Sequence, residues 1–289
     1  MWCTFIVAAV IVVLNTGVNA KPPSKILDGS GTDIKDAPFT VMLLDDANLE
    51  SPAGITCGGT IIGKKHILTA AHCLGYRLED DEVNHDYKWL RVVAGVSSHQ
   101  CGGKIYEISK AYIHPDYSGI LYNENDVRAD IAVLELKDRI IFSPKRKPIR
   151  LGSDPPPSHS QGIIFGWGDT HPSRLSAPSI LQKSVQTVYQ YDACKVIEPD
   201  LGYRKDELCI SASFGNSFCR GDSGGPLIVQ RKLVGVISNG YECGNVEPGA
   251  VSSVAYYKAW IEDAVRGTAE SKILPFVIND PQSSDSDDE

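Results

Sequence analysis

The sequence lacks an apolar segment long enough to cross a membrane. Its longest apolar run, Phe5–Leu14, has ten residues, whereas a helix that spans the hydrocarbon core needs about 20. Val18-Asn19-Ala20 follows, a small-residue pattern at which signal peptidase cleaves. A membrane anchor is the alternative interpretation, but the run is too short for it. We therefore predict that residues 1–20 are a signal peptide and that the protein is secreted and extracellular, with no membrane partner.

The sequence also lacks an excess of positive charge. It has 28 basic and 36 acidic residues and a formal net charge of −8 at pH 7. Removal of residues 1–25 takes away Lys21 and Lys25 and no acid, which leaves 26 basic residues and a net charge of −10. Because nucleic-acid binding depends on a basic surface, we expect no nucleic acid among the partners.

Cysteines at the spacing of metal ligands are lacking too. No Cys-x-x-Cys pair occurs and no histidine cluster stands beside the cysteines, so a zinc site is not expected. In an oxidising compartment six of the seven cysteines outside the signal peptide should pair, and fifteen pairings are open. The seven are Cys57, Cys73, Cys101, Cys194, Cys209, Cys219 and Cys243.

Short β-rich runs recur between turn signals, a spacing typical of an antiparallel sandwich or barrel. About 265 residues follow Lys25, enough for one large β domain or for two smaller cores, and length does not decide between them. The runs are Phe39–Leu44, Thr60–Thr69, Leu90–Ala94, Ile131–Leu136, Gly162–Phe165, Leu227–Val229 and Leu233–Ile237.

The end of the chain has two different patterns. Apolar side chains fall on one stripe within Ala255–Val265, which predicts a helix packed on the second β unit. The stripe consists of Tyr256, Trp260, Ile261 and Val265. Residues 267–289 end in an acidic polar run that cannot bury a core, so we predict a disordered tail there.

Gly221-Asp222-Ser223-Gly224-Gly225-Pro226 places a serine between glycines, where the backbone can turn sharply and its amides can approach a substrate oxyanion. The same letters fit the nucleophile turn of α/β-hydrolases or a simple solvated turn. An α/β-hydrolase needs its histidine after the serine. The last histidine, His171, precedes Ser223, so a catalytic serine here does not belong to that class.

Two upstream segments complete a pattern. His72 stands among small residues in Leu68-Thr69-Ala70-Ala71-His72-Cys73, and Asp130 leads into the apolar run Ile131–Leu136. Each alone has a structural explanation. Together with Ser223 they resemble the chymotrypsin (trypsin-like) family of serine proteases, in this chain order and with these flanking residues. The resemblance covers residues 26–266 and includes Gly166-Trp167-Gly168.

The resemblance implies an all-β fold of two antiparallel six-stranded β-barrels with a C-terminal helix. It implies that Ser223 attacks the scissile carbonyl, that His72 moves the proton and that Asp130 orients the imidazole. The N–H groups of Gly221 and Ser223 would form the oxyanion hole. Ser238-Asn239-Gly240 matches the segment that binds the substrate backbone as an extra strand.

The same resemblance divides six cysteines into pairs and leaves Cys101 without a partner. The implied pairs are Cys57–Cys73, Cys194–Cys209 and Cys219–Cys243. The resemblance implies no cofactor. Some relatives bind calcium through a carboxylate at the position where this chain has Val96, so no metal is expected.

Lys25-Ile26-Leu27-Asp28-Gly29 resembles the activation site of the family. Cleavage after Lys25 would remove residues 21–25 as a propeptide and free the Ile26 amine. That amine would pair with Asp222 and order the pocket and the oxyanion hole. Alternatively, Lys25 is only an exposed base near the signal peptide.

The family resemblance also implies which residues form the specificity pocket. Ser217 stands at the floor, where trypsin-like members have the Asp that pairs Arg or Lys. Gly240 and Gly249 match two wall positions that must be small to admit a large ring. These residues predict a chymotrypsin-like preference for Phe, Tyr or Leu. If the ring of Phe218 pointed inward, it would shorten the slot and shift the preference towards Leu or Met. The direction of the ring cannot be read from the sequence.

The predicted function is that of a secreted serine endopeptidase made as a zymogen. Expected partners are protein or peptide substrates, an activating trypsin-like protease and proteinaceous inhibitors, and the protein is expected to be a monomer. The alternative is a catalytically silent homologue with a binding or regulatory role. It is kept open because Asn239 replaces a usual Trp and because of Phe218.

Overall fold

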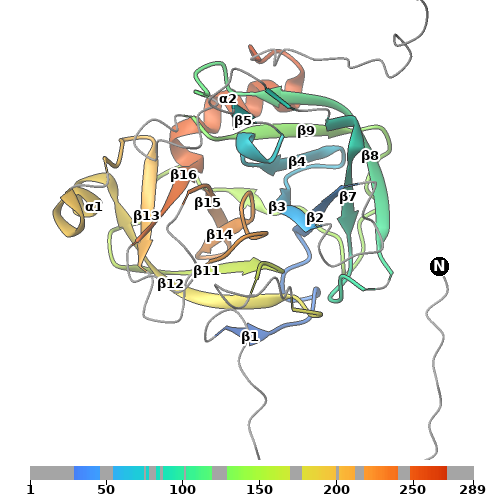
Figure 1. Cartoon of the computed structure of the whole chain (residues 1–289), viewed down its shortest axis with the longest axis horizontal. Coiled ribbons are helices and arrows are strands. Elements are labelled where there is room, and N and C mark those ends of the chain that lie inside the picture. Colours follow the sequence, from blue (N-terminus) through green and yellow to red (C-terminus); the bar gives the residue numbers. More distant parts are fainter. Residues whose placement is uncertain are drawn as a thin grey trace, which may run out of the picture.

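A computed structural model shows two closed β-barrels side by side, with a helix packed across them (Figure 1). The structure describes residues 29–45, 55–74, 76–77, 83–84, 87–100, 102–118, 129–169, 178–199, 202–211, 218–239 and 248–271. The predicted signal peptide, Lys25 and Ile26 lie outside these ranges, as do Ser217 and Gly240. Among the described residues no helix is both long and apolar enough to cross a membrane.

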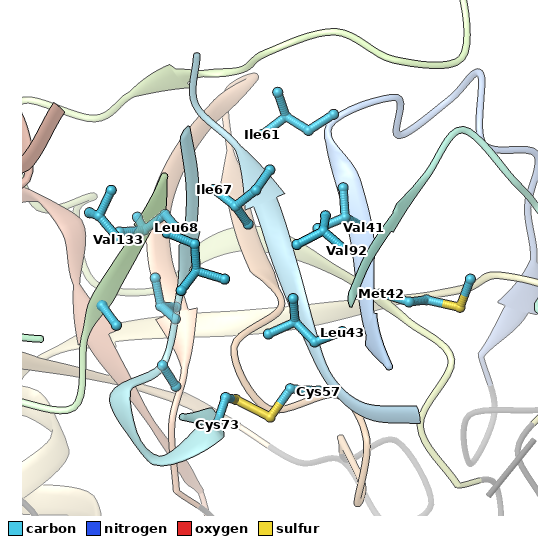
Figure 2. Packing of buried hydrophobic residues seen from close by; sticks show 14 of the residues in the cluster. Val41, Met42, Leu43, Cys57, Ile61, Ile67, Leu68, Cys73, Val92 and Val133 are labelled. Carbon is cyan, nitrogen blue, oxygen red and sulfur yellow. A yellow bond between two sulfur atoms is a disulfide. The ribbon is translucent and has the colours of Figure 1, made fainter. Parts of the chain in front are cut away.

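The first barrel is built from the N-terminal half of the chain. Its strand order is β2-β3-β4-β9-β8-β7, and every pair is antiparallel. Apolar side chains such as Val41, Ile67 and Val92 fill its interior (Figure 2). The strands are β2 (Thr40–Asp45), β3 (Ile55–Ile61), β4 (His66–Thr69), β7 (Leu90–Ala94), β8 (Lys104–Ile113) and β9 (Ala132–Leu136).

The second barrel closes because β12 pairs with both β11 and β13. Its ring runs β12-β11-β14-β15-β16-β13, again antiparallel. A separate apolar cluster that includes Ile164, Leu227 and Val251 fills it. The strands are β11 (Ser160–Gly166), β12 (Gln182–Gln190), β13 (Glu207–Ser211), β14 (Pro226–Val229), β15 (Lys232–Ile237) and β16 (Gly249–Ser253). The predicted fold class is therefore confirmed.

Shorter elements border the barrels. β1 (Ser30–Gly31) adds to β12, and β10 (Arg150–Leu151) adds to β15 as the one parallel pairing among the described strands. β5 (Tyr76–Arg77) pairs with β6 (Val83–Asn84). The short helices are η3 (Ala71–Cys73), η4 (Tyr87–Trp89) and α1 (Tyr191–Ile197).

Helix α2 (Val254–Arg266) confirms the predicted C-terminal helix but not its buried face. The buried residues are Val254, Tyr257, Ile261 and Ala264, which recur at the spacing of one helical face. Tyr256 is 62% exposed and Val265 is 38% exposed, so the predicted stripe was wrong at both positions. Ser253 caps the helix by accepting the Tyr256 N–H at 3.4 Å.

Residues 268–271 follow α2 and still contact the protein. Trp260 Nε1 donates to the carbonyl of Glu270 at 2.9 Å, and the Ile113 N–H donates to Ser271 Oγ at 3.0 Å. The first residues of the segment that the sequence assigns to a tail thus hydrogen-bond to α2 and β8. Residues 272–289 lie outside the described ranges.

Candidate active site

His72 lies in η3, the helical turn that follows β4 at the end of the first barrel. Ala70, the residue at the start of η3, is extended, and Ala70 and Ala71 are fully buried. A disulfide joins Cys73 to Cys57 of β3 (Figure 2). Small residues let this turn pack closely on the barrel, and the disulfide fixes it there, so the His72 backbone has little freedom.

Asp130 holds His72 through both carboxylate oxygens. Its Oδ2 lies 2.7 Å from His72 Nδ1, and its Oδ1 accepts the His72 backbone N–H at 2.8 Å. Two hydroxyl groups from the second barrel fix Asp130 in turn. Ser238 Oγ donates to Oδ2 at 2.5 Å, and Ser252 Oγ donates to the Asp130 carbonyl at 2.8 Å. Ring and backbone of His72 are therefore oriented by one buried carboxylate.

Burial and charge oppose each other in this pair. Burial by itself lowers the pKa of His72, but the charge and hydrogen bond of Asp130 outweigh it, so the pKa lies above the ordinary value of 6.5. Burial likewise opposes ionisation of Asp130, yet His72 and the Ser238 hydroxyl hold the pKa of that carboxyl below its usual range. The imidazolium that forms when His72 accepts a proton is thus stabilised in place.

Ser223 lies in the turn between Cys219 and Gly225, on the second barrel. Its carbonyl accepts the N–H of Gly58 from β3 at 2.7 Å, which ties the turn to the first barrel. The sulfur of Cys73 lies 3.9 Å from His72 Nε2 and 3.7 Å from the Ser223 carbonyl oxygen. The disulfide thus contacts both the histidine and the serine turn.

Gly224 makes this close approach possible. Its φ is +76°, and a Cβ there would lie 2.2 Å from Thr69 Oγ1 and 2.6 Å from the Gly58 carbonyl. No other residue fits without moving the serine turn away from β4. Within the described residues, Ser223 Oγ and His72 Nε2 form no hydrogen bond. Such catalytic hydrogen bonds are often long without substrate and shorten when it binds.

Two backbone donors next to Ser223 are available to a ligand. Gly221 has a φ of +94°, and a Cβ on it would lie 3.2 Å from the Gly168 Cα. The N–H groups of Gly221 and Ser223 donate no hydrogen bond to any residue that the structure describes, whereas those of Asp222, Gly224 and Gly225 do. Two N–H groups without a protein partner beside a serine hydroxyl are the arrangement that an oxyanion site requires.

Asp222 is buried beneath this turn, with 1% of its surface exposed. Its two oxygens accept the N–H groups of Gly168 and Cys219 at 2.8 and 3.0 Å. A Cβ on Gly166 would lie 1.9 Å from its Oδ1, and one on Gly168 would lie 2.4 Å from its Cγ. Burial, with a smaller contribution from Asp169, raises the pKa of Asp222 to about 6 although both N–H groups oppose this.

A serine, a histidine and a buried acid are thus assembled where the two barrels meet, and a family model described as Trypsin matches residues 26–261. The chain belongs to the trypsin family of serine proteases. Trypsin iota of Drosophila melanogaster is 31% identical over 90% of this chain and 96% of its own length. Hypodermin-A of Hypoderma lineatum is 30% identical over 86% of this chain and 91% of its own.

Solved structures agree with this membership. Neuropsin, a serine protease expressed in the limbic system of mouse brain, matches with a TM-score of 0.70 and 26% identity, over 82% of this chain and 99% of its own. A scabies mite inactivated protease paralogue matches with a TM-score of 0.69 and 25% identity, over 84% and 99%.

The disulfides follow the family pattern where they are described. Cys57–Cys73 and Cys194–Cys209 are both formed. Cys219 is disulfide-bonded as well. Its expected partner Cys243, and Cys101, lie outside the described residues. Cys57, His72 and Cys73 bring three metal-ligand atoms within 4.8 Å, but the two sulfurs are bonded to each other and are not thiolates.

Phe218 and Gly249, which the family resemblance assigns to the specificity pocket, lie directly against each other. A Cβ on Gly249 would lie 2.2 Å from Cε1 and 2.3 Å from Cζ of the Phe218 ring. Ser238 and Asn239, which the sequence assigns to substrate binding, pair with β16 beside them. The Ala250 N–H donates to the Asn239 carbonyl at 2.7 Å, and the Ser238 N–H donates to the Ala250 carbonyl at 3.2 Å.

Sequence reasoning missed several supporting residues. Ser252 contacts Asp130 from 122 positions away, and nothing in its neighbourhood distinguishes it. Ser238 was assigned to substrate binding, but its hydroxyl contacts Asp130. Gly166 and Gly168 lie against Asp222, where a side chain would not fit. The Gly-Trp-Gly segment of the sequence could have indicated this close packing.

Proposed function

We propose that this trypsin-family chain is a secreted serine endopeptidase that hydrolyses peptide bonds through an acyl-enzyme. The observation that carries the proposal is the Asp130–His72 pair, buried and doubly hydrogen-bonded, against the turn of Ser223 with its two free N–H groups. Each group has a role in acyl transfer, and none of these roles needs a metal or a cofactor.

In the first step Ser223 Oγ attacks the substrate carbonyl carbon and His72 Nε2 takes the hydroxyl proton. Asp130 keeps the other ring proton on Nδ1, so that Nε2 is free to accept. The carbonyl oxygen becomes an oxyanion and is met by the N–H groups of Gly221 and Ser223. Such donors lower the barrier because they are already oriented before charge develops.

Collapse of this intermediate breaks the peptide bond. His72 delivers its proton to the leaving amine, and the acyl group stays on Ser223. Water then repeats the sequence: His72 takes a proton from it, the acyl ester is hydrolysed and Ser223 is restored. The raised pKa of His72 supports the proton-accepting part of both steps, because Asp130 stabilises the imidazolium that forms.

Zymogen activation is part of the proposal. Asp222 is a buried carboxylate with two N–H donors and a pKa raised to about 6. A cation beside such a group stabilises its ionised form. Cleavage after Lys25 by a trypsin-like protease would supply the Ile26 amine. The Lys25→Gln variant should therefore be secreted normally and stay inactive after trypsin treatment, and full activity in it would refute the switch.

The proposed substrates are proteins or peptides with an apolar residue before the scissile bond. Ser217 replaces the acid that would pair Arg or Lys, so a basic side chain would be buried without a counter-ion, at a cost of about 3–5 kcal/mol. Proteinaceous inhibitors of the same shape as substrates are expected partners. The protein is proposed to act as a monomer.

A fluorophosphonate probe tests the activity itself. Trypsin-treated protein should be labelled at Ser223, and the Ser223→Ala and His72→Ala variants should not be. Tryptic peptide mapping then locates the label. Unlabelled wild-type protein with an intact fold would favour the catalytically silent alternative, in which the same surface binds a partner.

A further inference from the structure

The ring of Phe218 covers the face of Gly249 on which a side chain would grow. Two ring carbons lie 2.2 and 2.3 Å from the position of a Gly249 Cβ, whereas carbon atoms in contact are normally about 3.5–4.0 Å apart. The glycine is therefore required by the ring, because any side chain at 249 would overlap it. The space in front of Gly249 is occupied by the protein itself.

This space lies beside the segment Ser238–Asn239, which the family resemblance assigns to substrate binding. Gly249 begins β16, whose next residue pairs with the segment Ser238–Asn239. The Asn239 carbonyl lies 3.5 Å from the same Cβ position, and Ser238 contacts Asp130. The ring therefore lies beside the place where β16 pairs with the segment that adjoins the catalytic acid.

The ring is held in place by packing and by the backbone. Phe218 is partly buried and packs on the apolar cluster of the second barrel, which includes the fully buried Ile237 and Val251. The next residue, Cys219, is disulfide-bonded, and its N–H donates to Asp222. A swing of the ring towards solvent would give up these apolar contacts.

We propose that Phe218 fills the depth of the primary specificity pocket, so that the enzyme cleaves after small apolar residues such as Ala and Val. The inference rests on the proposed peptidase function and narrows its substrate class. In the pocket that the family resemblance implies, the bare Gly249 wall makes room for a substrate ring. Here a ring of the enzyme takes that room. A substrate Phe or Tyr would have to displace it.

A peptide series measures the effect. The trypsin-activated enzyme is given substrates that differ only in the residue before the scissile bond: Ala, Val, Leu, Phe or Arg. Each methylene that a pocket fits or rejects changes kcat/KM by about 10- to 200-fold. The kcat/KM of the Ala or Val substrate should therefore exceed that of the Phe substrate by about 100-fold or more. Arg should be a poor substrate, since its charge would face an apolar ring.

Phe218→Ser and Phe218→Val should reverse the order. Loss of the ring opens the slot, so the ratio of kcat/KM for the Phe substrate to kcat/KM for the Ala substrate should rise by about 100-fold or more. The valine variant keeps an apolar side chain against the barrel cluster and serves if the serine variant does not fold. Phe142→Ser is the matched control, because Phe142 is 39% exposed on the segment after β9, and it should leave the profile unchanged.

Fluorophosphonate titration of every preparation separates the two proposals. Labelled wild-type enzyme that prefers Phe or Tyr would overturn the pocket inference and leave the peptidase function standing. Wild-type enzyme that is not labelled would overturn both. Labelling of Phe218→Ser but not of wild type would show that the ring closes the site completely, which contradicts cleavage after small residues.

Discussion

The buried carboxylate of Asp222 makes a quantitative prediction about the uncleaved chain. Its pKa is raised from 3.8 to about 6, so the folded state binds this proton more tightly than the unfolded state does. Stability is therefore lost as the pH rises through that interval. Above that interval the free energy of unfolding is lower by about 3 kcal/mol than it is below the interval, since each pKa unit is worth about 1.4 kcal/mol.

The Asp222→Asn variant removes this pH dependence. Asn keeps the shape, but it offers one acceptor oxygen to the N–H groups of Gly168 and Cys219 where Asp offers two, which costs about 1 kcal/mol at every pH. The free energy of unfolding of the variant relative to its parent should therefore rise by about 2 kcal/mol between about pH 4.5 and pH 7.5. Both proteins carry Ser223→Ala to prevent autolysis.

Guanidinium unfolding of the single-chain proteins at the two pH values measures the difference. Asp192→Asn, which makes the same substitution at an exposed position on α1, is the matched control. After cleavage at Lys25 the proposed amine partner stabilises the ionised form, so Asp222→Asn should then destabilise the protein. A difference between Asp222→Asn and its parent that stays constant with pH would refute the burial argument.

Three further predictions concern the triad, the disulfide and the tail. Asp130→Asn should lower kcat by about 10⁴-fold, because an amide at this position favours the wrong tautomer of the His72 ring. The acidic limb of the pH–rate profile of this variant should move to lower pH, because the carboxylate that raises the pKa of His72 is lost. An acidic limb at the same pH as in the wild type would contradict this. Replacement of Cys57 and Cys73 by Ala should cost about 3 kcal/mol in urea unfolding, since the bridge closes a loop of 16 residues; a cost below about 1 kcal/mol would not fit. Deletion of residues 272–289 should leave kcat/KM and Tm nearly unchanged, whereas a large drop in Tm would show that the tail docks.

Several features could be predicted from the sequence because they depend on local patterns. Apolar runs such as those of β2, β7 and β9 identify strands, since their side chains are buried almost throughout. The run Thr60–Thr69, predicted as one strand, is instead a hairpin made of the end of β3 and all of β4. Apolar residues lie on both sides of the turn at Gly63, so the pattern alone does not show the turn.

The two longest strands were not predicted because they face water on one side. β12 alternates buried and partly exposed residues, and β8 carries exposed polar side chains along most of its length. Such a strand has too few apolar residues to form a run. Which face is buried is decided by the partner strands and not by the segment itself. The same reason explains the error in α2, where packing selected Tyr257 over Tyr256.

The sequence by itself determined the family and the chain order of His72, Asp130 and Ser223, because local motifs carry these features. The two disulfides described followed from the family resemblance, since spacing alone left fifteen pairings open. Only the tertiary structure decided the direction of the Phe218 ring and the hydroxyl of Ser252 on Asp130. Those features join residues that are far apart in the chain. Their geometry is set by how β13, β15 and β16 pack in the second barrel, and no local pattern contains that information.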